Sequence, residues 1–373
     1  MHANPLKTLG TFGQSIWLDY IRRDLIASGQ LRRLIEEDGL QGMTSNPTIF
    51  EKAIVGSQEY DQDIRAMAFE GKGVDAIYEA LSQGDVQRAA DEFRPVYDKT
   101  AGHDGYVSLE VNPHLAHDTK GTVEEAHRLW KTLARPNVFI KVPATAEGLP
   151  AIQALISEGI NVNVTLLFGL PRYRQVADAY LTGLAARAAH GNPLNHVASV
   201  ASFFVSRIDS LIDPLLDNII VQGGKAADLA KQVRGHVAIA NAKMAYQIYK
   251  EIFCGDRFKE LAAQGARAQR LLWASTSTKN PGESDVKYVE ALIGPDTVNT
   301  TPLETLDAYR DHGHPNARLE QGVEEARNVL ERLPDLGISL DHVAQQLEDD
   351  GVEKFNKPFD KLMQALASRS PRT

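Results

Sequence analysis

The stretch Asn137-Val138-Phe139-Ile140-Lys141-Val142-Pro143-Ala144 places an ammonium group inside an apolar, β-branched run. Such a run is typical of a buried strand in a parallel sheet. Burying a charged amine without a partner is costly, so a lysine in this setting tends to lose its proton and become nucleophilic. A neutral amine suits Schiff-base chemistry on a carbonyl substrate. The alternative is a lysine at a strand end that reaches water or holds a structural ion pair.

Strand-like runs of this kind recur along the whole chain, with longer helical patterns between them. There are eight: Ser15–Tyr20, Gln41–Asn46, Gly105–Val111, Val138–Ala144, Asn161–Phe168, His196–Phe204, Leu271–Ser277 and Asp296–Thr301. Strand–helix alternation at this number predicts an α/β protein with a single (β/α)8 TIM barrel. The competing architecture is a doubly wound open sheet, but no Gly-x-Gly-x-x-Gly turn follows the first run.

The helical patterns set the expected domain organisation. One helix is predicted over Thr122–Ala134, with threonine near its N-terminus, and another over Pro171–Ala189, which opens with proline. Residues 51–104 carry two or three helical patterns between the second and third strands, and residues 318–373 form a helical C-terminal extension. No Pro/Gly/Ser-rich linker separates either region from the rest. The prediction is therefore one domain over residues 1–373 with two additions.

Composition limits the range of partners and compartments. The chain has 373 residues, of which 43% are hydrophobic and 24% charged, which is typical of a soluble globular protein with a large core. Its formal net charge of −9 gives no electrostatic reason to expect nucleic acid or an anionic membrane as partner. A single cysteine, Cys254, excludes an internal disulfide. With no apolar leader or membrane-length run, the sequence predicts a cytoplasmic protein.

Three predicted strands in succession dedicate one face to polar side chains. Side chains alternate across a strand, so one face of a barrel strand points to the helices and the other to the lumen. Within Tyr106–Asn112, Glu110 lies opposite a valine and leucine face, and within Asn161–Leu167, Asn163 and Thr165 do the same. Lys141 likewise opposes three aliphatic residues. Together these faces predict a polar pocket at the mouth of the barrel.

Residues of the remaining strands extend the predicted pocket. Asp19 lies among large apolar neighbours, although alone it is as well explained by a backbone cap or an arginine pair. Asn46 precedes Pro47, where the plain interpretation is a turn and a helix start. Ser202, Arg207 and Lys279 follow the sixth and seventh strands, and the late loops of many barrels bind phosphate. For Arg207 and Lys279, the alternative is an ordinary solvated charge on the surface.

These segments resemble the transaldolase family, in its longer bacterial type. The resemblance spans nearly the whole chain, in the family's order. Its strongest passages are Thr44–Phe50, Phe139–Thr145 and Gly159–Leu166, and the later passages Ala201–Arg207 and Leu272–Thr276 also fit. It implies a class I aldolase-type barrel that transfers a dihydroxyacetone unit in the non-oxidative pentose phosphate pathway. The family commonly pairs, so a homodimer is one expectation, and no metal or organic cofactor is expected.

The resemblance also implies a role for each candidate residue. Lys141 attacks the C2 carbonyl of a ketose phosphate, while Glu110, with a water positioned by Thr165, transfers protons. Asp19 takes the C4 hydroxyl proton. Asn46 and Asn163 hold the three-carbon unit by hydrogen bonds, and Ser202, Arg207 and Lys279 anchor the phosphate. Lys279 departs from the shorter family members, which carry arginine there, and a lysine cannot provide bidentate geometry.

Two rival functions stay open at this point. A plain aldolase would use the same lysine chemistry but release free dihydroxyacetone. A non-catalytic sugar-phosphate-binding barrel would have no use for Lys141, Glu110 and Asp19 together. A metal-dependent lyase is not favoured, because His114 and His117 have no third ligand at a metal-binding spacing.

Overall fold

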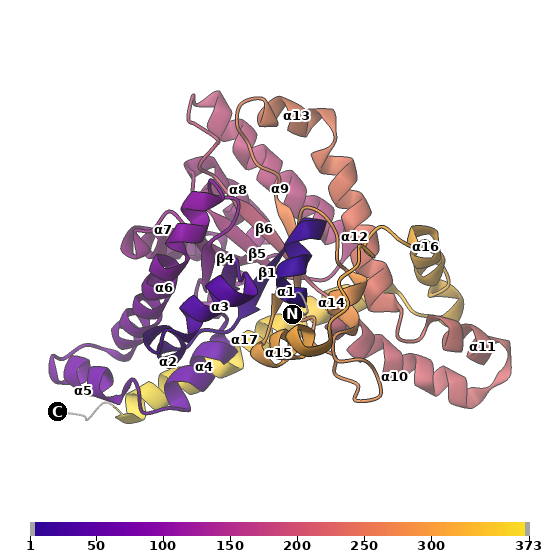
Figure 1. The fold of residues 1–373 in the computed structure, drawn as a ribbon, viewed down its shortest axis with the longest axis horizontal. Helices are drawn as coiled ribbons and strands as arrows, with labels where there is room; N and C mark the ends of the chain where they lie inside the picture. Colours follow the sequence, from indigo (N-terminus) through magenta and orange to yellow (C-terminus); the bar gives the residue numbers. More distant parts are fainter. Residues whose placement is uncertain (1–3, 370–373) are drawn as a thin grey trace.

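The computed structural model describes residues 4–369, and its centre is a closed barrel of eight parallel strands (Figure 1). Residues 1–3 and 370–373, which the predicted domain and extension include, lie outside the described part. The strands are β1 Gln14–Asp19, β2 Gly42–Thr44, β3 Tyr106–Glu110, β4 Val138–Pro143, β5 Val162–Leu167, β6 Ser199–Phe204, β7 Arg270–Ala274 and β8 Thr297–Thr301. Each strand pairs with the next, and β8 pairs with β1. The predicted (β/α)8 barrel is confirmed.

Seven helices alternate with these strands much as in a minimal barrel. They are α2 Arg23–Ala27, α3 Gln30–Asp38, α7 Thr119–Leu133, α8 Gly148–Glu158, α9 Leu170–Ala189, α14 Lys287–Ala291 and α15 Leu303–His312. Helix α9 matches its prediction to within one residue. Helix α7 starts three residues earlier than predicted, because the Asp118 side chain accepts a hydrogen bond from Gly121 N at 3.0 Å and caps the helix. Thr122 is therefore inside the first turn.

Helices precede the barrel and extend it after β2. Helix α1 Pro5–Leu9 and a 3₁₀ turn, η1 Gly10–Phe12, lead into β1. Helices α4 Pro47–Val55, α5 Asp61–Phe69 and α6 Val74–Lys99 then lie between β2 and β3, where extra helices were predicted. Asn46 caps α4 by accepting a hydrogen bond from Ile49 N at 3.0 Å, so the plain interpretation of the Asn-Pro pair as a helix start is confirmed. The limits 51–104 for an insertion stay a prediction.

A second helical expansion, which the sequence reasoning did not mark as an addition, lies between β6 and β7. It consists of α10 Ser206–Gln222, α11 Gly224–Val233, α12 Val237–Phe253 and α13 Asp256–Ala262. Figure 1 shows α10 and α11 projecting away from the barrel beside the later helix α16 (Val323–Glu331). The long interval in sequence between the sixth and seventh predicted strands, from Phe204 to Leu271, was the feature that indicated this region.

A long helix, α17 Leu340–Arg369, ends the described part of the chain and packs across several other elements. Two short 3₁₀ turns, η2 Pro113–Leu115 and η3 Pro334–Leu336, precede it in the sequence. Helix α17 contacts α4, α5, α6, α10, η2 and strand β5, and Figure 1 shows it passing from near α15 toward α5. Arg369 donates to Ile54 O at 2.9 Å, which fixes its end against α4. Among residues 4–369, no helix combines the length and apolarity needed to cross a bilayer.

The lower part of the barrel lumen is filled by aromatic and charged side chains. Trp17 and Phe139 stack at 6.1 Å between ring centroids, and Phe139 and Tyr106 at 4.3 Å. Beside them, Arg270 pairs with Asp104 at 3.0 Å, and both are buried. Asp104 precedes β3, Tyr106 and Arg270 begin their strands, and Trp17 Nε1 donates to Asp104 Oδ1 at 3.0 Å. This cluster therefore closes the end of the barrel that carries the amino termini of the strands.

Candidate active site

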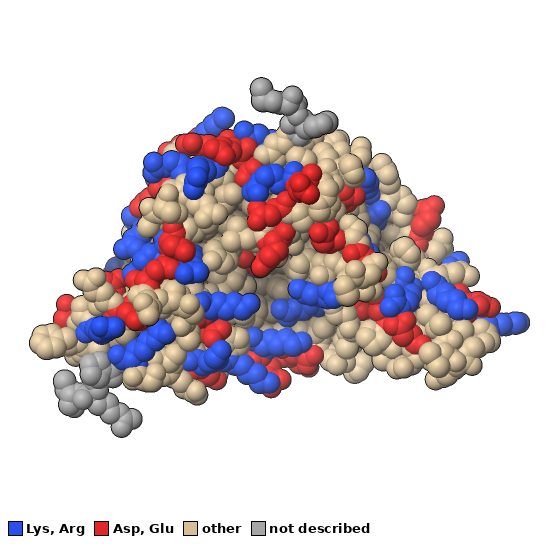
Figure 2. Space-filling model, turned by 60° about the horizontal axis from the view of Figure 1, so that its bottom comes forward, with Lys and Arg blue, Asp and Glu red and all other residues tan. Residues whose placement is uncertain are grey.

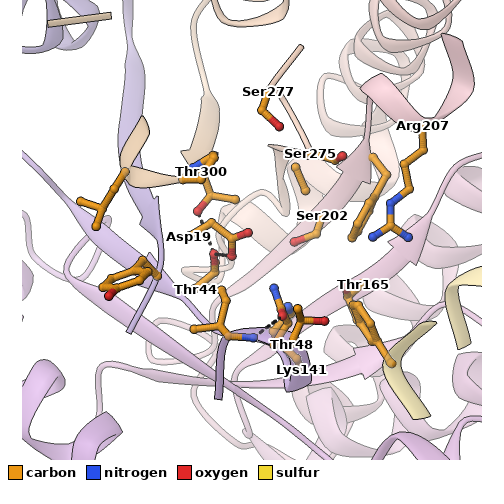
Figure 3. Close-up of a pocket in the computed structure, with 18 of the residues that line it drawn as sticks. Asp19, Thr44, Thr48, Lys141, Thr165, Ser202, Arg207, Ser275, Ser277 and Thr300 are labelled. Carbon is orange, nitrogen blue, oxygen red and sulfur yellow. Dashed lines mark hydrogen bonds between the residues drawn. The ribbon is translucent and has the colours of Figure 1, made fainter. Parts of the chain in front are cut away.

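A cavity of about 360 Å³ opens at the carboxyl ends of the strands, where barrel enzymes carry their active sites. Figure 3 shows its polar side chains pointing inward from several different strands. Seven of the nine candidate residues line it: Asp19, Asn46, Lys141, Thr165, Ser202, Arg207 and Lys279. The other two contact this lining directly: Glu110 lies 3.3 Å from Lys141, and Asn163 is hydrogen-bonded to Ser202.

Lys141 lies at the buried end of this cavity. It is 4% exposed, and its Nζ donates to Ser45 O at 2.9 Å. The same Nζ lies 3.3 Å from Oε1 of Glu110. Strand alternation explains the position, since Val138, Ile140 and Val142 face the helices and leave the lysine to the lumen. The alternative of a lysine that reaches bulk water is therefore wrong, whereas an ion pair is present and involves an acid of the candidate set.

Glu110 ends strand β3 in register with Lys141 on β4. Burial raises the pKa of Glu110 to about 7, and the nearby Lys141 charge opposes that rise only in part. Neither carboxylate oxygen has a hydrogen-bond partner among residues 4–369, so the contact with Lys141 is an ion pair without hydrogen-bond geometry. An acid with this pKa both gives and accepts protons near neutral pH.

Asp19 ends strand β1 and belongs to a chain of hydroxyl contacts. Thr44 Oγ1 donates to Asp19 Oδ1 at 2.6 Å and lies 2.8 Å from Thr300 Oγ1. Burial raises the pKa of Asp19, while Lys141, the Thr44 hydrogen bond and Arg207 act in the opposite direction. The predicted backbone cap or arginine pair is not what holds this carboxylate. Thr44 and Thr300 were not among the predicted site residues, because threonine is common in strands and does not mark a site by itself.

Thr165 presents a free hydroxyl to the cavity. The residue is fully buried, and its Oγ1 has no hydrogen-bond partner among residues 4–369. The next residue, Leu166, has a φ of +55°, and the pairing of β5 with β6 shifts register between Val164 and Leu167. A bulge beside a site re-aims the side chains around it. The hydroxyl is thus available to a water or a substrate atom.

The two amide side chains, Asn46 and Asn163, differ in their access to the cavity. Asn46 lines the cavity while its Oδ1 caps α4. Asn163 does not line the cavity and is fully buried beside Lys141, with which it pairs in register. Its Nδ2 donates to Ser108 Oγ at 3.0 Å, and its Oδ1 accepts from Ser202 Oγ at 2.6 Å. Asn163 therefore fixes the orientation of Ser202, and the polar strand faces predicted from the sequence do meet inside the barrel.

Two predicted basic residues, Arg207 and Lys279, also line the cavity. Arg207, in the first turn of α10, lies over the Phe204 ring at 5.0 Å, and its Nη1 is buried without a hydrogen-bond partner among residues 4–369. Burial lowers its pKa, with Asp19 and Asp350 opposing. Lys279 is exposed and donates to Ser277 Oγ at 2.8 Å. A buried guanidinium without a partner is suited to hold an anion.

One further basic residue at this cavity was missed from the sequence. Lys52, on α4, is exposed and lines the cavity from the side of Asn46. Figure 2 shows lysine and arginine side chains around a hollow near the middle of this face. Phe355 of α17 also lines the cavity. The C-terminal extension thus contributes to the site.

Known proteins are similar to the chain over nearly its full length. The family model described as transaldolase/fructose-6-phosphate aldolase matches residues 16–366. A transaldolase of Trichodesmium erythraeum is 51% identical, over 99% of this chain and 98% of its own. "Transaldolase 2" of Nostoc punctiforme is 48% identical over 99% and 98%, and a transaldolase of Saccharopolyspora erythraea 49% over 97% and 96%. The similarity covers the barrel and its helical additions.

Proposed function

Since the chain belongs to the transaldolase/fructose-6-phosphate aldolase family, we propose that it is a transaldolase of the non-oxidative pentose phosphate pathway. The reaction transfers a dihydroxyacetone unit from a ketose phosphate, sedoheptulose 7-phosphate or fructose 6-phosphate. The acceptor is an aldose phosphate, glyceraldehyde 3-phosphate or erythrose 4-phosphate. The observation that carries the proposal is the buried amine of Lys141, 3.3 Å from a carboxyl group with a pKa of about 7.

Lys141 is the nucleophile in this mechanism. Its neutral amine attacks the C2 carbonyl of the ketose and gives a carbinolamine. Glu110 then donates a proton to the carbinolamine hydroxyl, which leaves as water, and a protonated imine remains. Thr165, whose hydroxyl has no protein partner among residues 4–369, positions the water that takes part. The proximity of Glu110 to Lys141 supports this assignment, because a proton-transfer group must be within reach of the reacting atoms.

Asp19 is the base for carbon–carbon bond cleavage. It removes the C4 hydroxyl proton, the C3–C4 bond breaks, and the electron pair moves into the protonated imine. The first aldose phosphate then leaves, and the three-carbon unit stays attached to Lys141. The location of Asp19 in the same cavity as Lys141, on a different strand, supports this role. Thr44 holds its carboxylate in place by the 2.6 Å hydrogen bond.

The remaining candidates bind the substrate. Asn46 donates hydrogen bonds to the three-carbon unit, and Asn163 acts on it together with Ser202, to which it is bonded. Retention of this unit until the acceptor arrives separates a transferase from an aldolase. Arg207 binds the phosphate, supported by its buried Nη1 without a partner in residues 4–369, and Lys279 adds a second positive charge.

Borohydride trapping tests the central step. The enzyme is incubated with fructose 6-phosphate and reduced, and peptide mass mapping is expected to place a three-carbon adduct on Lys141. The variant Lys141→Arg keeps the positive charge but is expected to trap nothing. The variant Lys120→Ala, at an exposed lysine of α7, should trap as well as the unmodified enzyme. An adduct on another lysine, or none at all, would end the Schiff-base proposal.

Turnover with one substrate distinguishes the two activities of the family. Fructose 6-phosphate alone should give no sustained release of dihydroxyacetone, and erythrose 4-phosphate should restore turnover. Sustained release without an acceptor would make the protein an aldolase, and no flux in either assay would favour a binding barrel.

Three further predictions concern the conditions of the reaction. We propose that the enzyme is cytoplasmic and forms a homodimer, which fractionation and light scattering can test. We also propose that no metal or organic cofactor takes part, so activity should survive EDTA. A strict metal requirement would instead favour a lyase of the metal-dependent class.

A further inference from the structure

A second cavity, of about 220 Å³, lies outside the barrel between β3, α6, α7 and α17. It shares no lining residue with the substrate cavity. Its outer lining includes exposed side chains such as Asp75 and Arg128, and its inner lining includes Glu110. Glu110 therefore lies between two separate spaces, one that holds Lys141 and one that leads to solvent.

The state of the Glu110 carboxyl group calls for water in this second space. Its side chain is 8% exposed, and both oxygens lack a hydrogen-bond partner among residues 4–369. Buried carboxyl oxygens are nearly always hydrogen-bonded, to protein or to ordered water. Lys141 lies on one side at 3.3 Å, and the second cavity, which Glu110 also lines, offers space for a water on another side.

The walls of the second cavity are suited to hold water. At roughly 30 Å³ for each water in the liquid, its volume leaves room for several molecules. Tyr78, whose pKa is raised by burial and by the charge of Glu110, keeps its hydroxyl proton and can donate it. Glu125 accepts from Asn112 N at 3.2 Å and has further acceptor capacity. Polar groups thus accompany the cavity from Glu110 to the exposed Asp75.

Another side of Glu110 is nearly closed. A void of about 10 Å³ adjoins it there, lined by apolar side chains that include Leu166, Val352 and Phe355. A void of this size holds about one water at most, and an apolar one stays dry. While a sugar phosphate fills the substrate cavity, water cannot reach Glu110 through the mouth of the barrel. The cavity beside α6 and α7 is then its open route.

We propose that the cavity between β3, α6, α7 and α17 is a water passage, which connects Glu110 to solvent independently of the substrate mouth. The inference rests on the proposed transaldolase reaction. When the imine forms, the carbinolamine C–O bond breaks, the hydroxyl takes the proton of Glu110, and one water leaves. When the product imine is hydrolysed, one water adds to C2 and returns a proton to Glu110. One water therefore passes out and one passes in during each turnover, while the sugar phosphate occupies the mouth.

A reversible plug at Ser82 tests the passage. Ser82 lines the cavity, is 2% exposed, and its hydroxyl donates to carbonyl groups of its own helix, so Ser82→Cys changes little. In a Cys254→Ser background, this cysteine is the only thiol. Methyl methanethiosulfonate adds a thiomethyl group to it in the folded enzyme, and dithiothreitol removes that group. Failure of the reagent to label Ser82→Cys in the folded protein would overturn the proposal, because the passage would be closed.

The readout separates water-dependent from water-independent chemistry. The enzyme is first loaded with the dihydroxyacetone adduct, and the released aldose phosphate is removed. The sample is then divided into a plugged and an unplugged portion. After erythrose 4-phosphate is added, plugging should slow hydrolysis of the product imine, measured as release of sedoheptulose 7-phosphate, by about tenfold or more, because the sugar phosphate then fills the mouth. Consumption of added erythrose 4-phosphate should stay within about twofold, because bond formation at C3 needs no water, and dithiothreitol should restore hydrolysis. Equal hydrolysis with and without the plug would overturn the passage. Failure to load any adduct would overturn the proposed function instead.

Discussion

The Nζ atom of Lys141 lies 3.3 Å from Oε1 of Glu110, and the two residues are direct neighbours in the pairing of β3 with β4. The lysine is 4% exposed, so two charges at this place are costly to desolvate. Burial raises the pKa of Glu110 to about 7, so this acid still holds a proton in part of the molecules near neutral pH. A proton donor therefore lies within reach of the amine that attacks the substrate.

The pH dependence of imine formation is expected to follow Glu110. Dehydration of the carbinolamine needs the protonated acid, and the pKa of Glu110 is about 7. Single-turnover trapping with borohydride should therefore slow above pH 7, by about tenfold for each further pH unit. Glu110→Gln should lose about 10²–10⁴-fold in rate and lose this limb of the profile. A glutamine variant that keeps the same limb would assign the titration to another group.

Thr44 is expected to set the pH at which Asp19 becomes a base. Cleavage needs the carboxylate form, so activity is lost as the pH falls through the pKa of Asp19. The Thr44 hydrogen bond lowers this pKa, and Thr44→Val should raise it, which moves the acid limb of kcat/KM to higher pH. Thr44→Ser keeps the hydroxyl and should keep the limb in place.

Substitution of Asp19 should lower kcat by more than substitution of its hydrogen-bond partner Thr44 does. Asp19→Asn is expected to lower kcat by about 10²–10⁴-fold at every pH, because no other base replaces it. Imine trapping on Lys141 should persist, since Asp19 acts after that step. Normal turnover in Asp19→Asn would exclude it as the cleavage base.

Arg207 is expected to bind the substrate phosphate. Hydrogen bonds to charged groups contribute about 1.5–3 kcal/mol, so Arg207→Met should raise KM for fructose 6-phosphate by about 10–150-fold. KM for unphosphorylated fructose should change little. Arg207→Lys should lie between the two, because a lysine cannot form paired hydrogen bonds.

Lys279 provides the matched comparison for Arg207. It is exposed, and Lys279→Met should therefore raise KM for the phosphorylated substrate by less than Arg207→Met does. Equal effects of Arg207→Met on phosphorylated and unphosphorylated donors would show that it acts on the cavity and not on the phosphate.

The barrel was predictable because its strands repeat one simple pattern. All eight strands were found as short apolar runs between helical patterns, and on three of them the alternation of polar and apolar residues reflects one face on the helices and one on the lumen. The same alternation placed Lys141, Asn163 and Thr165 inside the barrel. These placements are reliable because a slip of one residue in strand register would turn the aliphatic face of each strand toward the lumen.

Features that depend on contacts between distant segments were not predictable in this way. Thr44 and Thr300 touch across 256 positions of sequence, and neither has a local pattern that marks it. Phe355 reaches the cavity only because α17 crosses the molecule. The hydrogen bond between Ser202 and Asn163, 39 positions apart, was equally hidden. A local pattern gives the face of a strand that a side chain occupies, but not the side chain that it contacts on another strand.

The opposite end of the barrel should govern stability without affecting catalysis. Arg270 donates to Ser15 Oγ at 2.8 Å and to Asp104 Oδ1 at 3.0 Å, and the side chains of this ion pair are 7% and 2% exposed. Arg270→Met would leave the Asp104 carboxylate buried without its cation. The loss of one partner of a buried pair costs about 3–5 kcal/mol, so the denaturation midpoint should fall clearly.

An exposed ion pair offers the control for this change. Arg174 and Glu251 lie 2.7 Å apart, with side chains 48% and 62% exposed, so Arg174→Ala should cost about 0–1 kcal/mol. The KM and kcat of folded Arg270→Met should stay near those of the unmodified enzyme, because the cavity at the carboxyl ends of the strands is untouched. Equal stability of the two variants would mean that the buried pair is as weak as a solvated one. A selective loss of kcat in Arg270→Met would instead connect the closed end of the barrel to the chemistry at Lys141.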